Sequence, residues 1–132
     1  MYVDQNLDWV TARANCFTRR VFHDIRDEVE KDVSTRNALI TDRQKADFVG
    51  FQIDPKDGAS FVVHRNGAGL VSRVTFKCDE STIMVLDEAG KKLIEAKLTL
   101  NDTGECRLVV GKDELSHWQF RRRALQDLFF SF

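Results

Sequence analysis

The run Leu70-Val-Ser-Arg-Val-Thr-Phe-Lys-Cys78 alternates apolar and polar side chains, and this pattern decides the fold class of the chain. Successive side chains of a β-strand point to opposite faces, so one face of this run should be buried and the other wet. Residues 92–100 repeat the pattern, with Ile94, Ala96 and Leu98 on the apolar side. One dry face and one wet face are typical of an antiparallel sheet.

Outward from this run, the same period of two predicts six strands, over residues 48–54, 60–65, 70–78, 82–87, 92–100 and 105–111. The links between them are short and rich in turn formers. Asn66-Gly67, for example, suits a type I′ turn because both residues tolerate a positive φ. Such links leave no room for crossover helices, so the prediction is a six-stranded antiparallel meander.

A helix is predicted before the sheet, because apolar residues recur at threes and fours from about residue 6 to residue 33. Asn6 or Asp8 is the expected N-cap, and a break is expected near residues 34–37. A second apolar stripe on the back of this helix contains Trp9, Cys16 and His23. We expect it to pack either on another element of the same chain or on a second copy.

Residues 113–132 predict a closing helix, with Asp113 as its N-cap. At 100° per residue one arc of this helix should cover the sheet, and it contains Leu115, Trp118, Leu125, Leu128, Phe129 and Phe132. Phe120 and Phe130 fall outside the arc. The whole chain, residues 1–132, is therefore predicted to be a single α+β domain with both helices on one face of the sheet.

The composition places few restrictions on function. A formal net charge of −1 gives no reason to expect a polyanionic partner. Three scattered cysteines, Cys16, Cys78 and Cys106, argue against a disulfide framework and for a reducing compartment. The first residues lack the pattern of a signal peptide, and no apolar run is long enough to span a membrane. These observations predict a cytoplasmic protein.

Catalysis is not favoured by the sequence. His23, Asp27 and Glu30 share one helical face, but a metal site on a helix usually needs ligands from a second helix, and no matching pattern is present. Cys16 lies near His23, but a packed thiol is the simpler interpretation. No GxSxG, HExxH, P-loop or GxGxxG motif occurs. We therefore expect neither metal nor cofactor, and no catalytic residues.

The surplus aromatic residues lead to the main functional hypothesis. Phe120 and Phe130 need a surface to contact, and Arg123 lies beside Phe130 on the outward side, an association common at interfaces. The predicted interface comprises Trp9, Cys16, Phe120, Arg123, Phe130 and Phe132. The expected function is a non-enzymatic protein-interaction module that forms a homodimer through its helix surfaces.

Two other functions fit the same pattern. A meander followed by a C-terminal helix resembles the layout of helix-grip lipid carriers, and the resemblance implies an apolar cavity between sheet and helices. Alternatively, the outer face of the sheet could hold a single-stranded nucleic acid through its basic residues. Those residues are Arg73, Lys77, Lys97 and Arg107.

Overall fold

Residues 6–40, 48–67 and 72–130 are described by a computed structural model, residues 48, 49, 66 and 67 by their backbone alone. One antiparallel sheet holds seven strands in chain order: β1 (Phe48–Asp57), β2 (Ser60–Gly67), β3 (Ser72–Cys78), β4 (Ile83–Leu86), β5 (Lys92–Leu100), β6 (Cys106–Val110) and β7 (Asp113–Leu115). The described helices are α1 (Trp9–Asn15), α2 (Thr18–Ala38) and α4 (His117–Phe130). The predicted α+β class is confirmed, with one strand more than expected.

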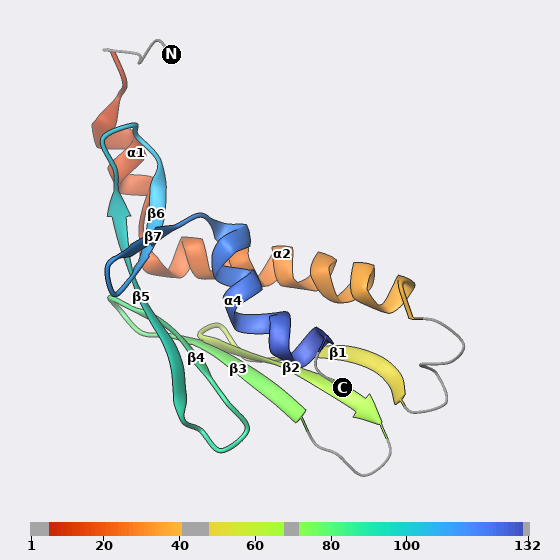
Figure 1. Ribbon diagram of the computed structural model, residues 1–132. Coiled ribbons are helices and arrows are strands. Elements are labelled where there is room, and N and C mark those ends of the chain that lie inside the picture. The colour runs from red at the N-terminus through yellow and green to blue at the C-terminus, as the bar shows by residue number, and fades with distance from the viewer. Residues whose placement is uncertain (1–5, 41–47, 68–71, 131–132) are drawn as a thin grey trace.

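Helices α2 and α4 lie on the same face of the sheet, whereas α1 stands beside the β5–β6 ribbon, away from the main layer (Figure 1). The long strand β5 connects the two parts. Its first half pairs with β4, through Ile94↔Val85 for example, and its second half pairs with β6. The sheet thus carries both the core under α2 and α4 and the ribbon that holds α1.

The core is built around four fully buried phenylalanine rings. Phe22 of α2 lies 5.3 Å from Phe61 of β2, which stacks on Phe76 of β3 at 4.6 Å between ring centroids. Phe120 of α4 meets Phe76 edge-on at 6.3 Å. The rings therefore join both helices to the centre of the sheet, and they occupy the space between sheet and helices.

The start of the closing helix differs from the prediction. Asp113 and Leu115 pair with β6 as the short strand β7, so Asp113 is not an N-cap. Helix α4 begins after Ser116, whose backbone N–H donates to Oε1 of Gln119 at 2.9 Å. This is half of a capping box, in which a residue in the first turn satisfies an otherwise unpaired N–H group.

The N-terminal helix is divided in two. Asp8 caps α1 as predicted, because its carboxylate accepts the N–H of Thr11 at 3.1 Å. The helix then ends at Cys16, and Phe17 is extended with φ −128° and ψ 152°. Residues 15–18 (Asn-Cys-Phe-Thr) are all weak helix formers, so interrupting the helix there costs little free energy. The prediction of one continuous apolar stripe on the back of a single helix is therefore wrong, because Trp9 belongs to α1 and His23 to α2.

Helix α2 also continues past its predicted break, to Ala38. The Asn37 side chain donates to the Phe51 carbonyl oxygen at 2.9 Å and accepts the Phe51 N–H at 2.8 Å. Gly50 permits this close approach: its φ is +128°, and a Cβ there would lie 2.9 Å from Asn37 Oδ1. These bonds to β1 outweigh the weak helix propensity of this segment.

Three further expectations concern the Asn66-Gly67 turn, the start of the third strand and the absence of a membrane-spanning segment. Asn66-Gly67 is not a two-residue turn, because β2 runs through Gly67 and Gly67 pairs with Phe48. The first two residues of the predicted third strand, 70 and 71, lie outside the described part of the chain. Within the described residues, no helix combines the length and the apolarity needed to cross a membrane.

Candidate protein-binding groove

A groove of about 510 Å³ separates the C-terminal half of α2 from α4. Its described lining residues include none from a strand, so it lies between the helices and not between helices and sheet. Its volume is within the range of about 300–1,000 Å³ typical of binding pockets. The lining residues are Asp32, Thr35, Arg36, Leu39, Trp118, Arg121, Arg122, Leu125, Gln126, Phe129 and Phe130.

Three large apolar side chains at this groove remain in contact with solvent. Leu39 follows the end of α2, Trp118 lies in the first turn of α4, and Phe130 is the last residue of α4. Their exposed fractions are 62%, 56% and 65%. Single exposed apolar residues are common on protein surfaces, whereas several around one groove are a feature typical of binding surfaces.

Ion pairs between the helices hold the walls of the groove in place. Arg121 of α4 donates through Nε to Asp32 at 2.7 Å, and its Nη1 lies 3.1 Å from Glu28. His117 Nδ1 lies 2.8 Å from the other carboxylate oxygen of Glu28. This network joins the first turns of α4 to the middle of α2, so the groove is present in the isolated chain.

Two further arginines flank the apolar rim. Arg36 is buried, donates from Nε to the Phe129 carbonyl oxygen at 2.9 Å, and lies 4.9 Å from the centre of the Phe130 ring. Burial lowers the pKa of Arg36 from its ordinary value. Arg122 is exposed and lies over Trp118 at 5.9 Å. Among the described carboxylates, none forms an ion pair with Arg122.

The groove therefore combines apolar surface with positive charge. Among its described lining residues are three arginines and one carboxylate, that of Asp32. Arginine and tryptophan are the residues that contribute most to protein interfaces, and an arginine beside apolar surface recognises a carboxylate next to an apolar group. The arrangement suits a protein segment that carries both.

A second group of exposed apolar residues surrounds α1. Leu7, Trp9, Val10 and Phe17 are all exposed, Trp9 to 64%, and α1 itself has no buried residue. We call residues 7–17 the arm. Leu7 packs over Gly104 in the β5–β6 turn, where a Cβ would overlap Leu7 Cδ2.

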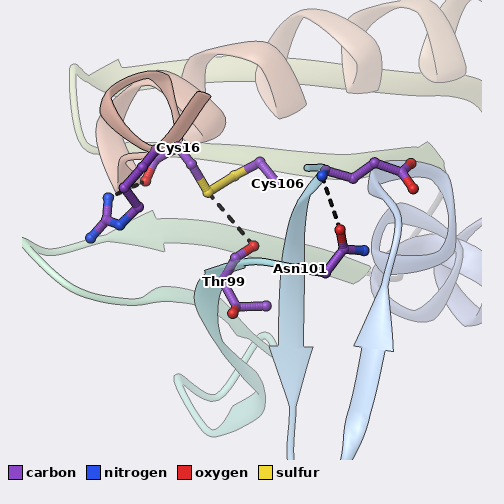
Figure 2. Close-up of a disulfide and its surroundings, with 6 residues drawn as sticks. Cys16, Thr99, Asn101 and Cys106 are labelled. Atoms are coloured by element: carbon purple, nitrogen blue, oxygen red, sulfur yellow. Dashed lines mark hydrogen bonds between the residues drawn. A yellow bond between two sulfur atoms is a disulfide. The ribbon is translucent and has the colours of Figure 1, made fainter. Parts of the chain in front are cut away.

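A disulfide between Cys16 and Cys106 fastens the arm to β6 (Figure 2). The sequence argument against disulfides, and the packed thiol expected for Cys16, are therefore wrong, and Cys78 is the one cysteine that remains a free thiol. Cys16 Sγ also lies 3.7 Å from the Thr99 carbonyl oxygen. A disulfide sulfur carries no proton, so that contact becomes a hydrogen bond only when the bond is reduced.

The six residues of the predicted interface are placed very differently. Phe130 lies at the groove and Trp9 on the arm, both exposed. Phe120 is fully buried, so its predicted outward position is wrong, and Cys16 is buried in the disulfide. Arg123 is exposed and paired with Asp113 at 2.8 Å, outside the groove lining. Phe132 lies outside the described residues.

The outer face of the sheet, which was predicted to be basic, also carries acidic side chains. Arg73, Lys77 and Lys97 are exposed, but Arg107 is paired with Glu105 at 2.8 Å. The acidic side chain of Glu95 lies on the same strand face as Lys97, two residues away. Phe51, Phe61 and Phe76 are the aromatic strand residues whose side chains are described, and all three point into the core. The described part of the outer face therefore has no aromatic ring on which a base could stack.

Among the described residues, His64 and Cys78 are the groups most relevant to catalysis, and they do not form a common site. Nε2 of His64 lies 2.6 Å from Asp54, and this hydrogen bond is the main cause that lowers the pKa of Asp54. No described serine or cysteine is hydrogen-bonded to His64. Burial raises the pKa of the free Cys78 thiol, which disfavours a thiolate nucleophile. No group of metal-ligating side chains is found among the described residues.

Sequence reasoning missed Arg36, Leu39 and the outward position of Trp118. Arg36 and Leu39 fell where the helix was expected to end, so neither was assigned to a helix face. Trp118 was assigned to the core-facing arc. The pair Ser116 and Gln119 was the available signal, because it places the start of α4 at residue 117 and excludes Leu115 from the helix.

Comparison with protein-family models, with curated proteins and with solved structures finds no match for this chain. The function therefore has to be inferred from the geometry of the site.

Proposed function

We propose that this protein is a non-enzymatic protein-interaction module that binds a protein segment in the α2–α4 groove and self-associates through it. The observation that carries the proposal is the rim of Leu39, Trp118 and Phe130 around a preformed groove. Full burial of a large apolar side chain contributes about 1.5–3 kcal/mol, and more than half of each of these side chains is still exposed, so a partner that covered them would gain about 1–2 kcal/mol from each. This gain is available only to a complex and not to the isolated chain.

Phe130→Asp is expected to weaken self-association about 30-fold or more, because it removes a large apolar side chain from the rim and places a hydrated charge on a surface that must become dry. Sedimentation equilibrium over a wide concentration range measures this change directly. The wild-type mass should rise from the 15.2 kDa of one chain toward about twice that value. The Phe130→Asp mass should stay near that of one chain at the same concentrations.

Leu93→Asp is the matched control for this measurement. Leu93 is also a large exposed apolar side chain, but it lies on β5 and does not line the groove. Its replacement should leave the dimer unchanged. A wild-type protein that stays at the mass of one chain, or a dimer that both variants weaken equally, would contradict the proposal.

The other two functions receive less support. The apolar carrier needs a cavity between sheet and helices, where the rings of Phe22, Phe61, Phe76 and Phe120 are in contact. Nucleic-acid binding lacks an aromatic platform on the described part of the outer face. Both functions remain predictions, and neither would use the groove between α2 and α4.

A cytoplasmic location also stays a prediction. The disulfide of Cys16 and Cys106 weighs against it, because such bonds are rare in a reducing cytoplasm. Trapping of free thiols with an alkylating reagent in acid-quenched cells decides the question. Alkylation of both cysteines would fit the cytoplasm, and their protection would favour an oxidising compartment.

A further inference from the structure

We propose that the groove of one copy holds the arm of a second copy, and that the exchange is reciprocal, giving a closed twofold dimer. This inference rests on the proposed function of the groove and names its occupant. The two exposed apolar surfaces of the chain, the arm and the groove rim, are then the two halves of one contact.

The arm has the character of a segment that is completed by a partner. Helix α1 has seven residues and buries none of them. A helix this short is not stable by itself in water, since isolated helices need roughly 12–15 residues even with favourable sequences. The disulfide and the contact of Leu7 with Gly104 hold its base, while Trp9 and Val10 remain exposed. A partner surface for these two side chains is missing within the described chain.

The groove matches the arm in chemistry. Asp8 stands next to Trp9, and hydrogen bonds from the Thr11 hydroxyl and N–H lower the pKa of Asp8, so its carboxylate is charged at neutral pH. Arg122 lies beside the exposed face of Trp118 without a described ion-pair partner. A tryptophan with an adjacent carboxylate is the combination that this apolar, arginine-lined groove suits.

The arm cannot reach the groove of its own chain. Phe17 immediately precedes α2 and Leu39 immediately follows it, and 21 helical residues separate them by about 30 Å. Figure 1 shows α1 and the C-terminal end of α2 at opposite ends of the molecule. Two copies with antiparallel α2 helices would place each arm at the groove of the other. Such an exchange closes after two copies, as in most soluble oligomers.

Direct contact between two grooves is less favourable. It would bring Arg122, which forms no ion pair with a described carboxylate, against Arg122 of the other copy. The reciprocal exchange avoids this repulsion. The arm and the groove lining contribute eleven residues each, so every copy offers about 20 interface residues, the low end of a standard interface.

The experiment mixes two variants, Trp9→Ala in the arm and Phe130→Asp in the groove. Each variant alone should dimerise about 30-fold more weakly or worse, because both of its contacts are damaged. The mixed pair keeps one intact contact, the normal arm of the Phe130→Asp chain in the normal groove of the Trp9→Ala chain. Native mass spectrometry separates the three dimers by mass, and the mixed dimer should dominate.

Both altered side chains are exposed, so unchanged melting temperatures should show that neither variant fails to fold. If Trp9→Ala has no effect while Phe130→Asp weakens the dimer, the arm inference is overturned and the groove proposal stands. If neither variant changes the dimer, or no dimer forms, both are overturned. A mixed dimer no more abundant than chance would show that Trp9 and Phe130 do not share a contact, and would also overturn the inference.

Discussion

Replacement of Cys16 and Cys106 together by alanine is expected to lower the free energy of unfolding by about 4 kcal/mol at 25 °C. The two cysteines are 90 residues apart, and a cross-link that closes a loop of this length restricts the unfolded chain strongly. The alanine pair also avoids a buried unpaired thiol at Cys16. Urea denaturation followed by circular dichroism measures the change.

A reducing agent supplies the internal control for this prediction. It should destabilise the wild-type protein by about the same amount and leave the double variant unaffected, because Cys78 is free in both. Equal stability of the oxidised and reduced wild type would show that the bond does not form in solution. The arm would then lack its main attachment to the sheet.

Phe120→Ala is expected to lower the free energy of unfolding by about 3–5 kcal/mol, the usual cost of a large cavity in a core. The Phe120 side chain is 0% exposed and meets Phe76 edge-on at the centre of the sheet. Trp118→Ala on the same helix should change stability by less than about 1 kcal/mol, because that ring is exposed. Thermal and urea denaturation of both variants compare the two positions.

The opposite ranking would contradict the orientation of α4. If Trp118→Ala were the more damaging change, the helix would lie as the sequence pattern first indicated, with Trp118 in the core. The groove between α2 and α4 would then have a different lining.

Strand periodicity was sufficient to predict most of this fold. In β3 and β5, side chains such as Phe76 and Ala96 alternate with charged residues, and a half-buried antiparallel sheet is the structure that satisfies such a pattern. The seventh strand was missed because Asp113 and Glu114 also suit a helix start. Propensity alone cannot decide between a cap and a three-residue edge strand.

The candidate site was less predictable, because it depends on contacts between distant segments. Three cysteines allow three pairings, and only the folded chain brings Cys16 to Cys106. The end of α2 is stabilised by Asn37 bonding to Phe51, which local propensity does not report. The inclusion of Leu115 in the closing helix shifted the predicted arc, so Phe120 and Trp118 exchanged their expected positions.

The most direct test of the account is whether Trp9 of one chain touches the groove of another. In a dimer assembled from equal parts of isotope-labelled and unlabelled chains, isotope-filtered nuclear Overhauser spectra detect contacts between copies only. Protons of the Trp9 indole are predicted to show cross-peaks to Trp118 or Phe130, the groove residues at the two ends of α4, in the other chain. Within one copy no such cross-peak is expected, because α1 precedes α2 and the groove lies at the C-terminal half of α2. A dimer whose cross-peaks join Trp118 to Trp118, with none from Trp9, would contradict the account.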